Sequence, residues 1–230
     1  MAAPLQLLRN VPLFAELDDP ALASIASIAV RKRYGARDIV VQQSEEGGEL
    51  FVIVSGHLKA LSAGADGRDI ALSVMGPGDV FGEMSLLDGE PRSATVAALD
   101  DCELVAVRRE PFMRFLESSP KAAIGLLRVM SQRLRGLTDR SDDVAFLRVG
   151  DRLAKRVAEL AERYGERQED GSLRLPFKLS QQEIGELVSA TRESANKQLK
   201  VWEQAGLLSH QAGHLAVHDV QRLRQHADES

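Results

Sequence analysis

The chain has 230 residues, of which 44% are hydrophobic and 27% are charged, and its formal net charge is −5. This length suits one large domain or two ordinary ones, and the composition is typical of a water-soluble globular protein. With no long apolar run and no basic-then-apolar leader, we expect a cytoplasmic protein without a membrane span or secretory signal. The single cysteine excludes an internal disulfide and a cysteine-rich metal site. The acidity argues against non-specific coating of nucleic acid, but not against one small DNA-reading face.

Short runs rich in Val, Ile and Leu, separated by glycines, fill the first half of the chain. A short helix is expected before them, over 20–28. The runs indicate strands at 39–41, 50–54, 58–61, 70–74, 95–98 and 103–107, with a hairpin turn at 63–67. Many short strands at regular spacing predict a β-roll or barrel.

The hydrophobic period changes after Pro120. Small or apolar residues then recur at alternating steps of four and three as far as Val144, with Ser141 as the polar exception. This pattern predicts a helix over 120–148, about 40 Å long, with the narrow seam of a coiled coil. We therefore expect a homodimer; the alternative is a helix packed only on its own domain. The predicted interface residues are Leu127, Met130, Leu134, Leu137, Ser141 and Val144.

The last third of the chain carries a helix-turn-helix signature. After a helix at 151–164, Ser180 and Glu183 form a capping box before one short helix. Thr191 caps a second helix over 192–204, which ends at Gly206. Two short strands at 207–209 and 215–217 complete a winged helix-turn-helix. Residues 148–230 hold 13 basic and 13 acidic side chains, so the excess acid belongs to the rest of the chain.

A glycine–acid–arginine pattern lies between two of the predicted strands. Gly82 permits close approach of the backbone, and the residues after it can form one turn whose N–H groups hold an anion. Arg92 can return to the same point as a charged fork, with the Ser93 hydroxyl beside it. Phosphate would repel Glu83, so its natural role is to accept a ribose hydroxyl. The alternative is a surface turn with a Glu83–Arg92 salt bridge.

The strings FGEMSLL (81–87) and PRSATV (91–96) resemble the phosphate-binding cassette of cyclic-nucleotide-binding domains. The segments 11–14, 54–56 and 76–79 resemble landmarks of the family's β-roll, and the long helix, the 145–147 segment and the winged helix-turn-helix follow in order. The whole chain resembles the Crp/Fnr family of bacterial transcription regulators. The resemblance implies an α+β fold with a jelly-roll-like sensor β-roll (1–118), a dimerisation helix (119–147) and a winged helix-turn-helix DNA-binding domain (148–230).

The resemblance also implies a cyclic-nucleotide effector, cAMP or cGMP, and no catalytic cofactor. The implied ligand residues are Gly82, Glu83, Met84, Ser85, Arg92, Ser93, Leu137 and Thr138. At the base, cAMP-responsive members use two adjacent small polar residues, usually Thr followed by Ser or Asn. The chain has Leu137 before Thr138. Leucine cannot hydrogen-bond an adenine amino group, so we expect weaker discrimination between bases.

The predicted second helix of the pair has the side chains of a DNA reader. The family pattern Arg-Glu-x-x-x-Arg stands here as Arg192-Glu193 followed by Lys197. Arginine and lysine donate to guanine and glutamate accepts from cytosine, although lysine selects less sharply than arginine. The alternative is a solvated helix face. With the expected phosphate contacts, the predicted DNA-binding residues are Ser180, Gln182, Thr191, Arg192, Glu193, Asn196, Lys197 and Lys200.

Other titratable residues carry weaker signals. Cys102 alone cannot hold a cluster and reads as a buried strand residue, and His57 is a weak candidate for a haem ligand. His210, His214 and His218 are four residues apart, but in a hairpin that spacing does not converge on a metal. We therefore expect no metal site and no catalytic residues.

The sequence predicts a homodimeric DNA-binding regulator that is not an enzyme. Nucleotide in the roll would reposition the long helix and set two recognition helices on a pseudo-palindromic duplex, with RNA polymerase as a further partner and no membrane. One alternative keeps the fold but responds to another effector or to none. Another is a nucleotide-binding regulatory module for a partner protein.

Overall fold

The computed structural model describes residues 8–64 and 69–228, so the predicted turn at 63–67 lies outside the described residues from 65 onward. The chain divides into two compact units. Residues 1–63 and 74–137 form the first, and residues 64–73 and 138–230 form the second. Within the described ranges, no helix is both long and apolar enough to cross a bilayer.

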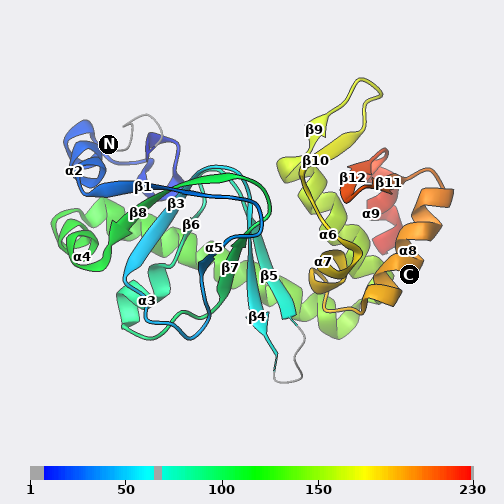
Figure 1. The fold of residues 1–230 in the computed structure, drawn as a ribbon, viewed down its shortest axis with the longest axis horizontal. Coiled ribbons are helices and arrows are strands. Elements are labelled where there is room, and N and C mark those ends of the chain that lie inside the picture. Colours follow the sequence, from blue (N-terminus) through cyan, green and yellow to red (C-terminus); the bar gives the residue numbers. More distant parts are fainter. Residues whose placement is uncertain (1–7, 65–68, 229–230) are drawn as a thin grey trace. The chain divides into compact units, whose positions relative to one another are not determined.

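The β-roll consists of two antiparallel sheets with strand orders β1-β8-β3-β6 and β2-β7-β4-β5 (Figure 1). The strands are β1 (Ala29–Tyr34), β2 (Ile39–Val41), β3 (Glu49–Ser55), β4 (Leu58–Ala63), β5 (Asp69–Met75), β6 (Val80–Phe81), β7 (Thr95–Ala98) and β8 (Cys102–Arg108). Every predicted strand of the roll is present, each within two residues of its expected ends. Strands β1 and β6 were not predicted.

Short helices cover the roll. They are η1 (Pro12–Phe14), α2 (Asp19–Ser27), α3 (Glu83–Asp88) and α4 (Arg109–Ser118). Asp18 caps α2 by accepting a hydrogen bond from the Ala21 amide at 3.0 Å, which explains why the helix begins one residue before the predicted Pro20. One hydrophobic cluster joins these helices to the sheet, with Phe14, Leu86 and Phe112 fully buried in it.

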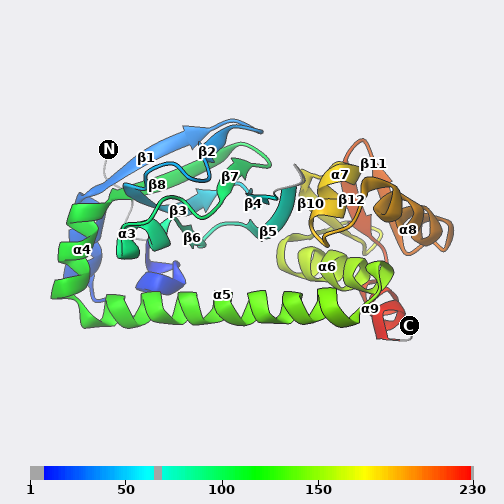
Figure 2. The same cartoon turned by 90° about the horizontal axis from the view of Figure 1, so that it is seen from below.

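Helix α5 (Pro120–Phe146) is one unbroken helix, two residues shorter than predicted (Figure 2). Its first turns contribute Ala122 and Leu126 to the core of the roll. Gly125 lies against η1: a Cβ at this position would be 2.4 Å from the carbonyl oxygen of Leu13, so only glycine permits the approach.

The second unit contains the winged helix-turn-helix. Its helices are α6 (Val149–Tyr164), α7 (Gln181–Glu186), α8 (Arg192–Gln204) and α9 (Val220–Asp228). The strands β9 (Glu166–Arg167), β10 (Leu173–Lys178), β11 (Leu208–Gln211) and β12 (His214–Val217) form a sheet in the order β11-β12-β10-β9. The helix pair and the wing strands were predicted, whereas α9, β9 and β10 were not. The α+β fold class is confirmed.

Candidate functional site

The predicted cassette is a tight turn followed by α3. Gly82 precedes this helix with φ 82°, in the left-handed region that favours glycine. A Cβ on Gly82 would lie 2.5 Å from Arg92 Nη1 and 2.8 Å from the Glu49 carbonyl oxygen, so a larger residue cannot occupy the turn without displacing them. The predicted single turn of helix after Gly82 is therefore present, and Arg92 does return to it.

Glu83 is held at the start of α3 by a residue that was not predicted. The side chain of Arg133 on α5 donates from Nη1 to Glu83 Oε1 and from Nη2 to the carbonyl oxygen of Val80. Glu83 is only 3% exposed, and its second oxygen, Oε2, has no hydrogen-bond partner among the described residues. A buried carboxylate oxygen without a hydrogen-bond donor is energetically unfavourable, and a hydroxyl group of a ligand could supply that donor.

Arg92 is buried and lies against backbone carbonyl groups. Nη1 donates to the Gly82 carbonyl at 2.9 Å and Nη2 donates to the Glu49 carbonyl at 2.7 Å. Burial lowers the pKa of Arg92, and the nearby carboxylates of Glu49 and Glu83 act in the opposite direction. The predicted alternative, a Glu83–Arg92 salt bridge, is not present, since Glu83 pairs with Arg133 instead.

The guanidinium of Arg92 lies over the ring of Phe51. Phe51 and Phe81 are stacked with their centroids 4.9 Å apart, and Arg92 Cζ lies 5.9 Å from the Phe51 centroid. Lys32 Nζ lies 5.5 Å from the same centroid and pairs with Glu49 Oε2 at 2.6 Å. Cation–π contacts of this kind fix the direction of the arginine as well as stabilising it.

The loop 44–48 closes on the cassette, and we call it the cassette loop. The Ser44 amide donates to the Arg92 carbonyl at 2.9 Å, and the Arg92 amide donates to the Glu45 carbonyl at 2.8 Å. A Cβ on Gly47 would lie 2.2 Å from Ser85 Cβ and 3.2 Å from Arg92 Cζ. The loop therefore packs directly on Ser85, which is 3% exposed, and on Arg92.

The remaining predicted ligand residues differ in their surroundings. Ser93 donates its hydroxyl to Met84 Sδ at 3.7 Å, a weak bond between exposed side chains. Leu137 is 49% exposed on α5, and Thr138 after it is also exposed. The structure thus brings Gly82, Glu83, Ser85 and Arg92 together, with Met84 and Ser93 at their edge.

Sequence reasoning missed Arg133 and Glu49. Arg133 precedes Leu137 by four residues, so both lie on one face of a helix. That spacing was an available signal for a residue near the predicted base site, whereas the burial of Glu83, and with it the need for a cation, is known only from the structure. Glu49 contributes its carbonyl oxygen to Arg92, and no side-chain pattern can reveal a backbone contact.

The predicted dimer seam is a row of largely exposed side chains. Leu127 is 63% exposed, Leu134 67% and Val144 51%, and Ser141 is also exposed. Met130, also predicted at the seam, is half-buried and packs against the core of its own roll.

The predicted DNA-reading side chains lie on α8 and on the helix caps. Arg192, Glu193, Lys197 and Lys200 are exposed, whereas Asn196 is half-buried and its Oδ1 accepts a hydrogen bond from Gln181 Nε2 at 2.8 Å.

Ser180 and Thr191 cap α7 and α8, as predicted. Ser180 forms the full capping box with Glu183, with its amide 2.7 Å from Glu183 Oε2. Thr191 Oγ1 accepts from the Ser194 amide at 3.2 Å. Gln182 donates to Glu186 at 3.2 Å.

Arg152 ties the start of α6 to the turn of the helix pair. Its Nε donates to the Val188 carbonyl at 3.1 Å and its Nη1 donates to the Leu147 carbonyl at 3.0 Å. The turn between α7 and α8 is therefore anchored to the segment that follows α5.

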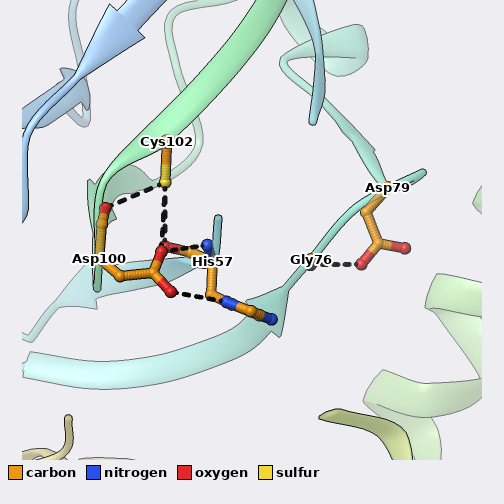
Figure 3. A network of polar contacts seen from close by, with 5 residues as sticks. All are labelled: His57, Gly76, Asp79, Asp100 and Cys102. Carbon is orange, nitrogen blue, oxygen red and sulfur yellow. Dashed lines mark hydrogen bonds and ion pairs between the residues drawn. The ribbon is translucent and has the colours of Figure 1, made fainter. Parts of the chain in front are cut away.

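His57, Asp100 and Cys102 form a polar network at one end of the roll (Figure 3). His57 Nδ1 lies 2.8 Å from Asp100 Oδ2, and the His57 amide donates to Asp100 Oδ1 at 2.5 Å. Burial raises the pKa of Asp100, but the hydrogen bonds from His57 and Cys102 and the charge of His57 together outweigh it and lower the pKa overall. Burial and Asp100 raise the pKa of Cys102 to about 12, so its thiol stays protonated. Among the residues described, no cluster of His, Cys, Asp and Glu could hold a metal ion.

Comparison with known proteins covers both units. The cyclic nucleotide-binding domain family matches residues 31–119, and the Crp-like helix-turn-helix domain family matches residues 151–226. A CRP-like cAMP-activated global transcriptional regulator of Mycobacterium tuberculosis is 31% identical over 222 residues, covering 96% of this chain and 99% of the relative. The cAMP-activated global transcriptional regulator CRP of Salmonella typhimurium is 29% identical, covering 83% of this chain and 90% of the relative.

Solved structures share the fold. The c-di-GMP responsive global regulator CLP of Xanthomonas campestris has a TM-score of 0.77 at 24% identity, covering 88% of this chain and all of that one. The catabolite activator protein of Thermus thermophilus has a TM-score of 0.54 at 27% identity, covering 94% of this chain and 98% of that one.

Proposed function

Because the chain belongs to the CRP/FNR family of transcription regulators, we propose that it is a homodimer whose affinity for DNA is set by a cyclic nucleotide bound in the β-roll. Proteins of this family are DNA-binding regulators and not enzymes. The observation that carries the proposal is the unpartnered, buried Oε2 of Glu83 beside the buried guanidinium of Arg92.

The ribose of the nucleotide would bind at Glu83. Arg133 occupies Oε1, and Oε2 lacks a donor within the described ranges. A carboxylate accepts hydrogen bonds only, so the natural occupant is a hydroxyl, such as the 2′-hydroxyl that a 3′,5′-cyclic nucleotide retains. The carboxylate of Glu83 would repel a phosphate at this point, so we expect the phosphate to bind on the Arg92 side of the site.

The cyclic phosphate would bind Arg92, Ser93 and the backbone of 82–85. Only two N–H groups of Arg92 are used by the carbonyls of Gly82 and Glu49, and a guanidinium carries more donors than these. The Ser93 hydroxyl donates a hydrogen bond to the sulfur of Met84. Sulfur is a weak acceptor, which a phosphate oxygen readily replaces. The stacked Phe51 and Phe81 hold the guanidinium in place before the ligand arrives.

The base would face α5 at Leu137 and Thr138. A leucine offers apolar contact but no hydrogen bond, so the site should bind adenine and guanine with similar affinity. This departure is the reason to keep a second candidate function, in which the same fold responds to an effector other than cAMP.

Dimerisation through α5 would bury the exposed seam residues Leu127, Leu134 and Val144. A leucine-rich seam at heptad spacing is normally covered by a second helix, because each buried leucine side chain contributes about 1.5–3 kcal/mol. Two copies of α8 would then read a pseudo-palindromic site, with Arg192, Glu193, Asn196 and Lys197 at base edges and Ser180, Gln182, Thr191 and Lys200 at phosphates.

Calorimetry with cAMP, cGMP and cyclic di-GMP, paired with DNA gel shifts at fixed salt, tests the proposal. We expect heat from cAMP or cGMP, lost in Arg92→Ala and in Glu83→Ala, and tighter DNA binding in the presence of the same nucleotide. Heat from cyclic di-GMP alone would favour the other-effector function. Nucleotide binding without DNA binding under any condition would instead indicate a regulatory module for a partner protein.

A further inference from the structure

Arg109, the first residue of α4, connects both sides of the cassette. Its side-chain Nε donates to the carbonyl oxygen of Leu86 at 2.8 Å. Its backbone amide donates to the carbonyl oxygen of Gly48 at 2.9 Å. Leu86 belongs to α3, which begins with Glu83, and Gly48 ends the cassette loop that packs on Arg92. One residue therefore contacts the two segments that hold the candidate ligand groups.

The side-chain bond is made at the C-terminal end of α3. The last carbonyl groups of a helix have no partner within the helix, so they accept hydrogen bonds from outside and favour a nearby cation. Helix α3 ends at Asp88, and Gly89 follows with φ 77°. A Cβ on Gly89 would lie 3.5 Å from Arg109 Nη2, so the guanidinium covers this end of the helix.

Helices α3, α4 and α5 share one hydrophobic core. Leu86 of α3, Phe112 of α4 and Ala122 of α5 all belong to it and are fully buried. Only Ser119 separates α4 from α5 along the chain. Close-packed interiors pass displacements on to their neighbours, so a shift of α3 against α4 must also be felt at the start of α5.

We propose that Arg109 is the positioning residue that couples occupancy of the cassette to α4 and α5, an inference that rests on the function proposed above. It is not one of the candidate ligand residues, and it acts through Leu86 and Gly48. When a nucleotide draws Glu83 and Arg92 toward it, α3 and the cassette loop move, and Arg109 carries both movements into the first turn of α4. Binding free energies are reciprocal, so the same residue also sets how much DNA raises the affinity for nucleotide.

The test compares Arg109→Gln and Arg109→Lys with Arg108→Gln, a matched control that removes the same charge from the adjacent exposed residue. Calorimetry gives the nucleotide affinity of each variant, using cAMP and cGMP. Fluorescence anisotropy gives the DNA affinity with and without saturating nucleotide at one salt concentration. The ratio of the two DNA affinities is the coupling factor.

We expect Arg109→Gln to reduce the coupling factor about tenfold, which is within the usual range of allosteric couplings, and Arg108→Gln to leave it unchanged. Arg109→Lys keeps the charge but loses the planar fork, so its factor should fall between those of Arg109→Gln and the wild type. A merely structural role predicts a lower melting temperature with an unchanged factor, and that result overturns the inference. If Arg109→Gln does not fold, a wild-type factor in Arg109→Lys overturns it as well.

The same experiment distinguishes failure of this inference from failure of the proposed function on which it rests. A wild-type protein that binds neither nucleotide overturns both. Suppose that the wild type binds nucleotide and then binds DNA more tightly, and that Arg109→Gln has the same coupling factor. That result overturns only the role of Arg109.

Discussion

Arg133 of α5 and Glu83 of α3 form an ion pair although they lie 50 residues apart in the sequence. The Glu83 side chain is 4% exposed, whereas that of Arg133 is 36% exposed. Arg133 donates a hydrogen bond to one carboxylate oxygen, Oε1, while the other, Oε2, has no hydrogen-bond donor among the described residues. The acid in the candidate ribose site is therefore held in place by the same helix that carries Leu137.

Replacing Arg133 with Gln should destabilise the protein. The substitution leaves Glu83 buried without its cation, and the partly exposed position of Arg133 limits the loss to about 1–2 kcal/mol. Urea denaturation measures the free energy of unfolding. Arg135→Gln, an exposed position on the same helix, should change it by less than about 0.5 kcal/mol, and equal effects of the two variants would contradict the assignment.

Two adjacent glycines should respond differently to the same methyl group. Gly47→Ala places a Cβ 2.2 Å from Ser85 Cβ, so the cassette loop must move, at a cost of about 1–3 kcal/mol. Nucleotide affinity should fall with it. Gly48→Ala meets no atom within 4 Å and should be close to neutral. Thermal unfolding and calorimetry of both variants check this, and similar behaviour of the two would refute the tight contact.

Restoring a polar side chain at the base should sharpen selectivity. Leu137→Thr supplies a hydroxyl at the position where we expect the base to contact α5. We expect the ratio of cAMP to cGMP affinity to rise about tenfold, because a hydrogen-bonding site rejects the wrong partner more strongly than an apolar one does. Competition calorimetry measures the ratio. An unchanged ratio would mean that the base does not meet residue 137.

Base-reading and phosphate-binding residues should be separable by salt and sequence. Arg192→Ala should weaken DNA binding by about 1–3 kcal/mol and relax preference at one base pair of each half-site. Lys200→Ala should weaken binding to all sequences alike and lower the salt slope by about one per protomer. Anisotropy titrations across several salt concentrations and single-base variants check both expectations. A sequence-independent loss in Arg192→Ala would assign that residue to phosphate instead.

The Asp100 network should give a defined acid dependence. The folded pKa of Asp100 lies below its unfolded value, so its contribution is fully present above the unfolded pKa, near 4, and is lost as pH falls through the folded pKa. Asp100→Asn should therefore lower stability by about 1–2 kcal/mol at neutral pH, and the difference from wild type should shrink below about pH 4. Denaturation at pH 7, 5 and 3.5 measures it. Asp139→Asn, at an exposed position, serves as the control.

Local patterns predicted the elements whose side chains repeat at regular spacing. The glycine-bounded strands, the heptad helix, the capping box of Ser180 and the turn at Gly82 all follow from neighbouring residues, and the structure contains each of them. The cassette was found for the same reason, because Gly82, Glu83 and Arg92 lie close together in the sequence.

The missed elements depend on distant partners. Strand β1 carries three successive basic residues, and it forms its antiparallel ladder with β8, a strand about seventy residues further along the chain. Arg31 also pairs with Glu103 of β8, and Lys32 pairs with Glu49 of β3. Strand β10 contains Pro176, which normally argues against a strand, but the register with β12 shifts between Arg174 and Lys178, so the proline sits where the ladder is interrupted. The Arg133–Glu83 pair likewise has no local signature.

Because the thiol of Cys102 is buried, this chain is suitable for site-specific labelling at introduced cysteines. It is the only cysteine in the chain, it is 4% exposed, and its pKa is raised to about 12. The thiolate is the nucleophile that reacts with a maleimide, so this buried, protonated thiol should react slowly. Cysteines introduced at exposed positions of the two units, such as Glu117 in the first and Glu169 in the second, would therefore be the ones that a maleimide dye modifies. Distances between dyes on the sensor and reader units could then be followed during nucleotide and DNA titrations without first removing a native cysteine.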